Sequence, residues 1–439
     1  MGKRVKNVVV IGAGFAGLNV CKALKNVPVN IALFDRNNYH LFQPLLYQVA
    51  TAALSPADIA FPIRSIFRGQ KNVDCVLCEV TNIDLAKGCV YAGEQCVDYD
   101  YLVVAAGATH SYFGRDEWEK FAPGLKRIED ATEIRKRILL AYEEAEHEMD
   151  EASRRAKLTF IVVGGGPTGV ELAGALREIA AEQIQKDYRN IDTSTARVIL
   201  VEANDRVLKN MNPALSDKAG QTLKKMGIEL QLGGRVTEID ENGVKIGDDR
   251  IGANNVFWAA GVKANPLGKM LGTPTDRAGR VNVNADLSVP GYPNVFVIGD
   301  LANVTDPKTK QPVPGLAPAA MQMGKHVGKL IRQEVTAGVP VEKRLPFEYW
   351  DKGTMATIGK ARAVADIGGW KFSGFVAWMM WSVIHLLFLI TFRSKILVLI
   401  NWIGTYIFSS KGARLITGDF KPRVTQMRDV TPDYETSTA

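Results

Sequence analysis

The first 35 residues combine two hydrophobic patterns. Val8–Ile11 and Val29–Asp35 are short, mostly apolar runs, whereas the segment FAGLNVCKALKN between them has apolar residues at intervals of three and four. Short apolar runs are typical of buried strands, and the longer interval is typical of one face of a helix. The pattern therefore predicts a strand, a helix and a second, parallel strand.

Three glycines occupy the turn between the first strand and the helix. Gly12, Gly14 and Gly17 stand in the register G-x-G-x-x-G, and Asp35 ends the second strand. In dinucleotide-binding folds the first glycine permits a tight turn, the second lets a pyrophosphate approach the backbone, and the third lets helix and strand pack closely. An acidic residue at the second strand accepts hydrogen bonds from ribose hydroxyls. The segment predicts a dinucleotide-binding site.

The pattern recurs in the middle of the chain. LTFIVVGGGPTGVELAGALREIA contains Gly164, Gly166 and Gly169 in the same register, and the later run RVILVEA places Glu202 at the end of a strand. A carboxylate there binds the free 2′-hydroxyl of NADH and repels the 2′-phosphate of NADPH. The second site is expected to bind NADH, although Arg206 nearby leaves NADPH open.

Two dinucleotide sites in one chain favour one bound flavin and one exchangeable nicotinamide. YPNVFVIGDLANV resembles the late FAD segment of flavoproteins that bind two dinucleotides, in which the aspartate binds the ribityl chain. YLVVAAGAT and VFWAAGVKANP resemble the A-x-G linkers of the same family. Besides the glycine loops, the resemblance implies FAD contacts by Ala106, Gly107, Asp300 and Ala317, and NADH contacts by Ala260 and Gly261.

The expected fold class is α/β, with two Rossmann-like dinucleotide-binding domains (FAD and NADH) and a C-terminal membrane-anchoring helical region. Residues 1–120 and 271–345 should form the FAD domain, with the NADH domain, residues 121–270, inserted between them. The C-terminal region is expected at residues 346–418, where its first part reads as two or three short strands. Residues 419–439 have no periodicity and are expected to form a tail.

The C-terminal region contains an uncharged run, Phe372–Phe392, which at 21 residues is long enough to span a bilayer. On a single helix, Lys371, Gly374, Ser382, His385 and Arg393 would share one polar face. Large aromatic residues recur through this run and through a second uncharged run, Ile396–Ser410, rather than only at their ends, as expected for a helix lying at the membrane interface: Trp378, Trp381, Trp402 and Tyr406. We therefore expect an in-plane anchor, with a full crossing as the alternative.

Charge and cysteine content narrow the function classes. The net charge is +7, and basic residues flank the apolar run, which favours anionic lipid over nucleic acid as a partner. Five cysteines are too few for a disulfide framework in 439 residues, so a reducing compartment is expected. No cysteine spacing indicates a metal site. The first strand begins after six residues, which leaves no room for a signal or transit peptide.

The segments NYHLFQPLLYQVATAALSPADIAFPIRSIFR, AAGATHSYFGRDEW and GGGPTGVELAGAL together look like those of a type II NADH:quinone oxidoreductase, a single-subunit, non-pumping respiratory dehydrogenase. The resemblance extends from Val8 to about Gly418. It implies non-covalent FAD, NADH as donor and a membrane quinone as acceptor. It also implies a monotopic protein on the cytoplasmic face of the inner membrane, for which a homodimer is plausible.

The same resemblance points to three further site residues. Glu171 matches a glutamate that lies beside the flavin and takes part in quinone reduction; a simple helix-dipole role is the alternative. Gln322 matches the second of two family glutamines, while Pro318 stands in place of the first. Lys371 matches, loosely, a lysine at the mouth of the quinone tunnel, and a lysine snorkelling at the interface is the alternative.

Other flavoenzyme classes fit less well. Disulfide reductases and sulfide oxidases need cysteines beside the flavin, and residues 38–64 contain none. A soluble NADH:ferredoxin or rubredoxin reductase would not need the C-terminal apolar run. A flavin-bearing membrane redox sensor without turnover would not need Glu171 and an intact second glycine loop. We expect an FAD-dependent NADH dehydrogenase that reduces quinone, with no metal.

Overall fold

The computed structural model describes residues 4–408 and 413–418, and the chain divides into two compact units. Unit 1 contains the described parts of Met1–Phe42, Ile59–Ser111 and Gly261–Gly353. Unit 2 contains Gln43–Asp58, Tyr112–Ala260 and the described part of Thr354–Ala439. Each unit is thus assembled from three separate segments of the chain.

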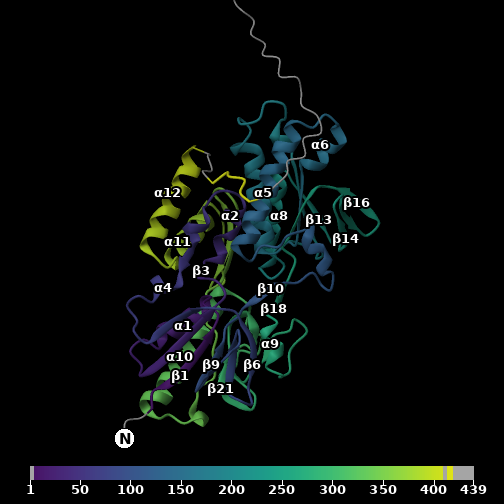
Figure 1. The fold of residues 1–439 in the computed structure, drawn as a ribbon. Coiled ribbons are helices and arrows are strands. Elements are labelled where there is room, and N and C mark those ends of the chain that lie inside the picture. The colour runs from purple at the N-terminus through teal and green to yellow at the C-terminus, as the bar shows by residue number, and fades with distance from the viewer. Residues whose placement is uncertain (1–3, 409–412, 419–439) are drawn as a thin grey trace, which may run out of the picture. The chain divides into compact units, whose positions relative to one another are not determined.

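Unit 1 is built on a six-stranded sheet with the order β20-β21-β9-β1-β2-β5. Strands β1, β9 and β21 of this sheet are labelled in Figure 1. The neighbouring strands run parallel except at β20. Val8, Val10, Val103 and Val297 are fully buried, so the centre of the sheet forms the core. The strands are β1 (Lys6–Ile11), β2 (Val29–Asp35), β5 (Val73–Leu77), β9 (Tyr101–Val104), β20 (Ser288–Val289) and β21 (Tyr292–Val297).

Helices α1 (Phe15–Ala23) and α10 (Ala317–Ala337) pack closely in unit 1. A Cβ atom on Gly324 would lie 2.3 Å from the carbonyl oxygen of Ala16, so only glycine lets the two backbones approach this far. The remaining elements of unit 1 are short: β3 (Tyr39–Leu41), β4 (Ala60–Pro62), α4 (Ile63–Ile66), β6 (Val80–Asp84), β7 (Cys89–Ala92), β8 (Gln95–Asp98), β10 (Ala108–His110), β18 (Val262–Ala264), α9 (Leu267–Met270), β19 (Val281–Asn282) and β22 (Ala302–Asn303).

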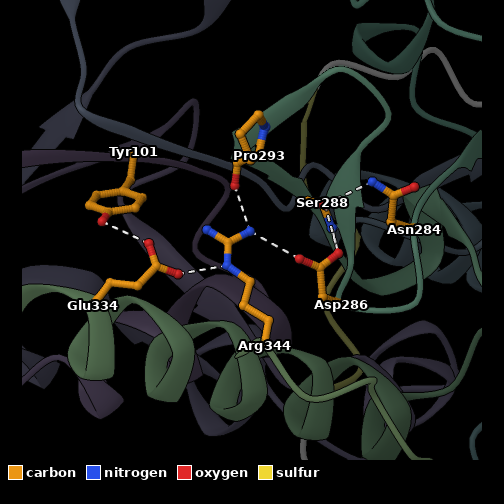
Figure 2. Close-up of polar contacts among 7 residues, drawn as sticks. All are labelled: Tyr101, Asn284, Asp286, Ser288, Pro293, Glu334 and Arg344. Atoms are coloured by element: carbon orange, nitrogen blue, oxygen red, sulfur yellow. Dashed lines mark hydrogen bonds and ion pairs between the residues drawn. The ribbon is translucent and has the colours of Figure 1, made fainter. Parts of the chain in front are cut away.

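A buried arginine ties the chain that follows α10 to the sheet of unit 1 (Figure 2). The side chain of Arg344, which is 3% exposed, donates from Nε to Glu334 (2.6 Å) and from Nη1 to Asp286 (2.9 Å). The Tyr101 hydroxyl donates to the other oxygen of Glu334 (2.9 Å), and the guanidinium lies over the ring of Phe296. The two carboxylates compensate the buried cation, which would otherwise be costly to remove from water.

One feature of unit 1 was not expected from the sequence. Cys89 on β7 and Cys96 on β8 form a disulfide, whereas we expected the cysteines to be reduced. The antiparallel pairing of these two strands brings the cysteines together, with a Cα–Cα distance of 5.8 Å. The other pair, Cys75 and Cys78, stays free.

Unit 2 contains a parallel four-stranded sheet with the order β13-β12-β11-β17. Its strands are β11 (Thr159–Val163), β12 (Arg197–Glu202), β13 (Ile228–Leu232) and β17 (Asn255–Trp258), and a separate antiparallel sheet consists of β14 (Val236–Asp240), β15 (Gly243–Ile246) and β16 (Asp249–Gly252). The helices are α2 (Leu46–Ala50), α5 (Ile128–Glu146), α6 (Glu151–Lys157), α7 (Pro167–Glu178), which continues into the π-helix η3 (Ile179–Gln183), and α8 (Pro213–Lys225). Helix α3 (Pro56–Ile59) ends at the boundary between the units.

The C-terminal part of unit 2 begins with an antiparallel sheet, β23 (Thr354–Gly359), β24 (Arg362–Ile367) and β25 (Trp370–Gly374). Strand β23 packs on α7 so closely that a Cβ on Gly174 would lie 1.7 Å from the carbonyl oxygen of Ile358. Two helices follow, α11 (Phe375–Phe388) and α12 (Phe392–Phe408), drawn in yellow in Figure 1.

The uncharged run is therefore not one helix, and the single polar face predicted for it is wrong. Lys371 lies in strand β25, opposite Asp366 of β24, and Gly374, with a positive φ of 73°, separates this strand from helix α11. Leu389 is extended, so Arg393 belongs to a second helix. Within residues 4–408 and 413–418, no helix has both the length and the apolar character needed to cross a bilayer. The predicted tail after Gly418 lies outside the described residues.

Candidate functional site

The carboxyl ends of β1, β2, β9 and β21 meet at one edge of the sheet of unit 1, and the first glycine loop lies there. Gly12 has φ of 100°, and a Cβ on it would lie 2.4 Å from the carbonyl oxygen of Ala105. A Cβ on Gly17 would lie 1.9 Å from the carbonyl oxygen of Gly12. A Cβ on Gly14 would meet no atom within 4 Å, so the loop is open where a pyrophosphate would approach it.

Asp35 holds this glycine loop in place. One carboxylate oxygen accepts the N–H of Ala13 (2.7 Å) and the other accepts the N–H of Asn37 (2.7 Å). Burial raises the pKa of Asp35, and these two hydrogen bonds oppose the shift. The ring of His40 lies 2.8 Å from the carbonyl oxygen of Ala13 and packs edge-on against Phe15. His40 could not be predicted as part of this site, because no sequence motif marks it.

The other predicted FAD residues follow strands of the same sheet. Ala106 and Gly107 come after β9, and Gly107 has φ of 70°. Asp300 lies in a short 3-10 helix after β21, with its carboxylate near Gly315. Ala317 is the first residue of α10. Since parallel strands end at one edge of a sheet, unit 1 offers these residues together with the glycine loop, and the arrangement fits a dinucleotide.

The second glycine loop repeats this geometry in unit 2. Gly164 has φ of 114°, and a Cβ on it would lie 2.5 Å from the carbonyl group of Ala259. A Cβ on Gly169 would lie 1.8 Å from the carbonyl oxygen of Gly164. A Cβ on Gly166 would meet no atom within 4 Å. Glu202 accepts a hydrogen bond from the N–H of Gly165 (2.6 Å), just as Asp35 in unit 1 accepts one from the N–H of Ala13. The loop leads into the N-terminus of α7, where free backbone N–H groups favour the binding of phosphate. The residues fit a second dinucleotide.

The predicted linker residues Ala260 and Gly261 lie at the boundary between the units. Ala260 follows β17 and is the last residue of its segment in unit 2. Gly261 begins a segment of unit 1, where its carbonyl oxygen accepts the N–H of Ser111 (3.1 Å).

Unit 2 also contains a pocket of about 90 Å³ beneath its C-terminal helices. Its walls come from α2 and the residues after it, from α7 and η3, from the end of β23 and the residue after it, and from α11 and α12. They consist of Tyr47, Gln48, Thr51, Ala53, Glu171, Ala175, Glu178, Glu182, Gln183, Thr357, Gly359, Lys360, Trp378, Trp381, Ser382, Trp402 and Thr405. Aromatic rings and a few polar groups that converge on one space are typical of a site for a small organic ligand.

Glu171 projects into this pocket from the first turns of α7. Burial raises the pKa of its carboxyl group to about 8, and a hydrogen bond with the backbone of Thr357 opposes the shift only in part. The carboxyl group therefore carries a proton at neutral pH. A protonated acid in an apolar pocket can both donate a hydrogen bond and release a proton.

Two other predicted residues lie elsewhere. Gln322 in α10 of unit 1 exchanges two hydrogen bonds with the backbone of Trp350, one in each direction at 3.0 Å. Lys371 is exposed on β25 and does not line the pocket. Sequence reasoning missed Tyr47, Gln48 and Trp402, because they come from helices about 350 residues apart in the chain. The aromatic content of both segments was the only signal.

Comparisons with known proteins agree with this arrangement. Residues 6–324 match the family described as pyridine nucleotide-disulphide oxidoreductase, and residues 351–411 match the NDH2 C-terminal domain. The chain is 45% identical over 452 residues to the type II NADH:quinone oxidoreductase Ndh of Mycobacterium tuberculosis, covering 99% of this chain and 96% of that one. It is 46% identical over 424 residues to NdhA of the same organism, covering 93% and 89%.

A solved structure extends the likeness to the fold. The NDH2 of Plasmodium falciparum, determined in complex with NADH, superposes with a TM-score of 0.85 over 94% of this chain and 100% of the other. Sequence identity is 19%, so this likeness concerns the fold.

Proposed function

This chain belongs to the type II NADH:quinone oxidoreductase family, and from that premise we propose which of its residues carry out each part of the reaction. The protein oxidises NADH and reduces a quinone, with FAD as cofactor. The balanced reaction is NADH + H⁺ + quinone → NAD⁺ + quinol. Bound FAD supplies the acceptor for the hydride and delivers two electrons onward. The protein residues bind, orient and supply the proton.

Unit 1 is proposed to hold the FAD. Gly12, Gly14 and Gly17 would receive the pyrophosphate at the start of α1, and Asp35 would accept hydrogen bonds from ribose. Ala106, Gly107, Asp300 and Ala317 complete the site at the ends of β9 and β21 and the start of α10. The open space at Gly14, beside glycines that tolerate no Cβ, supports this assignment.

Unit 2 is proposed to hold the NADH at its own glycine loop, with Gly164, Gly166 and Gly169 at the pyrophosphate. Glu202, half-buried beside Gly165, would accept hydrogen bonds from ribose hydroxyls. Ala260 and Gly261 would line the nicotinamide end. A carboxylate at Glu202 supports NADH over NADPH, because it would repel a 2′-phosphate.

The pocket of unit 2 is proposed to receive the quinone headgroup. The observation that carries this proposal is Glu171, whose protonated carboxyl group lies among aromatic rings under α11 and α12. The hydride brings one of the two protons of the quinol, and Glu171 would supply the other. Two roles implied by the family resemblance stay predictions: Gln322 at the quinone end of the flavin, and Lys371 at the mouth of the quinone tunnel.

The C-terminal helices are proposed to lie on lipid. One face of α11 and one face of α12 expose apolar side chains at helical spacing: Phe375, Val376, Met379, Val383, Leu387, Phe392, Ile396, Leu399, Ile400 and Ile403. Leu387 is 65% exposed and Phe392 is 77% exposed. A concentration of exposed apolar residues on adjacent helices indicates a membrane or protein contact, and the nearby basic residues favour anionic lipid.

This surface supports a peripheral, monotopic location. We place the protein on the cytoplasmic face of the inner membrane, and a homodimer stays a prediction that sedimentation of the detergent-solubilised protein would test. The same surface argues against a soluble ferredoxin reductase. A flavin-bearing sensor would bind NADH without sustained turnover.

Two experiments test the proposal. Flavin-loaded protein should catalyse sustained NADH oxidation with a short-chain quinone; reduction of ferricyanide without reduction of quinone would contradict it. The double variant Leu387→Glu and Ile400→Glu should bind vesicles containing anionic lipid at least about tenfold more weakly, because two charges would have to enter the apolar interface. Leu77→Glu, at an exposed leucine of unit 1, serves as the control and should bind normally.

A further inference from the structure

A chain of hydrogen bonds along the wall of the pocket of unit 2 connects α12 with α2. The indole Nε1 of Trp402 donates to Oε1 of Gln48 (2.7 Å), and Nε2 of Gln48 donates to the hydroxyl oxygen of Tyr47 (2.9 Å). Gln48 is 8% exposed and Tyr47 is 7% exposed. All three side chains line the pocket that contains Glu171.

The chemistry of the three groups fixes the direction of this chain. An indole nitrogen can only donate, so Gln48 must turn its carbonyl oxygen toward Trp402 and its amino group toward Tyr47. The amide orientation, often ambiguous, is thus determined by its neighbour. The Tyr47 oxygen accepts from Gln48, which leaves its own hydrogen to be donated. Among the described residues, no acceptor for that hydrogen is found.

A quinone needs such a donor. It has two carbonyl oxygens that accept hydrogen bonds and no group that donates, so a pocket that binds it must provide donors. The protonated carboxyl group of Glu171 is one, and the hydroxyl of Tyr47 is another. Burial, with the nearby carboxylate charge of Glu171 when it ionises, raises the pKa of Tyr47 well above its ordinary value, so the hydroxyl keeps its hydrogen.

We propose that Tyr47 is a catalytic residue that donates a hydrogen bond to one quinone oxygen, and that Gln48 and Trp402 are positioning residues that orient it. The inference rests on the proposed function, because it assumes that the pocket receives a quinone. Two electrons come from NADH, one proton comes with the hydride, and Glu171 supplies the second proton and regains it from the medium. Tyr47 transfers no proton; its hydrogen bond strengthens as negative charge develops on the oxygen.

The position of Trp402 adds a structural consequence. It lies on α12, where its ring packs against Trp381 of α11 at a centroid distance of 5.5 Å. The donor to the quinone is therefore oriented through a residue of the helices that we place on lipid. Correct packing of α12 and orientation of Tyr47 are coupled through a single amide.

The experiment compares Tyr47→Phe, Trp402→Phe and the double variant with the flavin-loaded wild type in lipid vesicles. Tyr112→Phe is the matched control, since Tyr112 is a buried tyrosine of unit 2 that donates to a backbone carbonyl and does not line the pocket. Three quantities are measured: kcat/KM for a short-chain quinone, the rate with ferricyanide, and binding of oxidised quinone without NADH. Quenching of tryptophan fluorescence reports binding, because three tryptophans line the pocket.

Tyr47→Phe should lower kcat/KM for quinone about ten- to a hundredfold, because this is the effect expected from losing a hydrogen bond to a charged group. The rate with ferricyanide should stay unchanged. Quinone binding should weaken less than kcat falls, because the bond strengthens in the transition state. Trp402→Phe should lower quinone turnover to a smaller extent, and it should have little further effect in the Tyr47→Phe background.

Three outcomes would overturn the inference. The first is Tyr47→Phe with wild-type quinone kinetics, and the second is additive effects of the two substitutions. The third is an equal loss with ferricyanide, which would indicate general damage to the protein. Failure of the proposed function would be distinguishable, because the wild type itself would then neither reduce quinone nor show quenching.

Discussion

Replacing Glu171 with glutamine should remove the pH dependence of quinone reduction near pH 8. Burial raises the pKa of this carboxyl group from its ordinary 4.5 to about 8. About nine-tenths of the protein would carry the proton at pH 7 and about one-tenth at pH 9. If the protonated form supplies a proton to the quinone, wild-type turnover should fall about tenfold over this interval.

The assay measures the ratio of quinone to ferricyanide turnover from pH 6 to pH 10, since the ratio cancels effects on NADH binding and hydride transfer. Glu171→Gln retains a hydrogen-bond donor but has no proton to release, so the ratio at pH 7 should fall by roughly a hundredfold and become independent of pH. Other ionisable groups line the pocket, namely Tyr47, Glu178, Glu182 and Lys360. Glu182→Gln is the control, because Glu182 is exposed, and it should keep the inflection.

An inflection near pH 8 that persists in Glu171→Gln would refute this reasoning, because another group would then be the proton donor. The same pKa predicts a stability effect. The native state holds the proton between about pH 4.5 and pH 8 while the unfolded state releases it. The free energy of unfolding of the wild type should therefore fall as pH rises through this window. In Glu171→Gln it should fall less over the same window, because glutamine does not titrate.

Three further substitutions test other parts of the structure. Arg344→Met should lower the free energy of unfolding by about 3 kcal/mol, measured by chemical denaturation, because it leaves two largely buried carboxylates, 14% and 10% exposed, without their cation. Arg64→Met, at an exposed ion pair, should cost less than about 1 kcal/mol. Gly174→Ala places a methyl group against a strand carbonyl, so it should lower the free energy of unfolding, measured by thermal denaturation, by about 1–3 kcal/mol. Gly220→Ala is the control: its Cβ would lie 3.8 Å from the nearest atom, so the free energy of unfolding should stay the same or rise slightly. Glu202→Gln should raise KM for NADH about tenfold and narrow the preference over NADPH, measured by steady-state kinetics with both donors.

The sequence predicted the geometry of the two glycine loops, because that geometry is local. A strand, three glycines at fixed spacing and a helix lie within about 20 residues, and each glycine has one steric reason to be there. The α/β fold class, the flavin and nicotinamide cofactors and the quinone reaction are confirmed by the family. The positive φ of Gly12 and Gly164 and the close approach of Gly17 and Gly169 follow from the register itself.

The C-terminal region could not be predicted in the same way. Absence of charge marked Phe372–Phe392 as apolar, but it gave no sign that β25 would take its first residues or that the helix would end at Phe388. The first depends on the pairing of β25 with β24, which lies outside the run, and the second on Leu389, whose backbone is extended. Similarly, no local pattern connects Trp402 with Gln48, or Cys89 with Cys96, because both contacts depend on the tertiary fold.

Quinone is proposed to be reduced in the pocket of unit 2, beside Glu171. The most direct measurement is photolabelling of the flavin-loaded protein in vesicles with an azido-quinone, followed by mass spectrometry of its peptides. Labelled residues should lie within residues 47–53 or 378–405, and an excess of unmodified quinone should suppress the label. Label confined to unit 1, or label that excess quinone does not suppress, would contradict the claim.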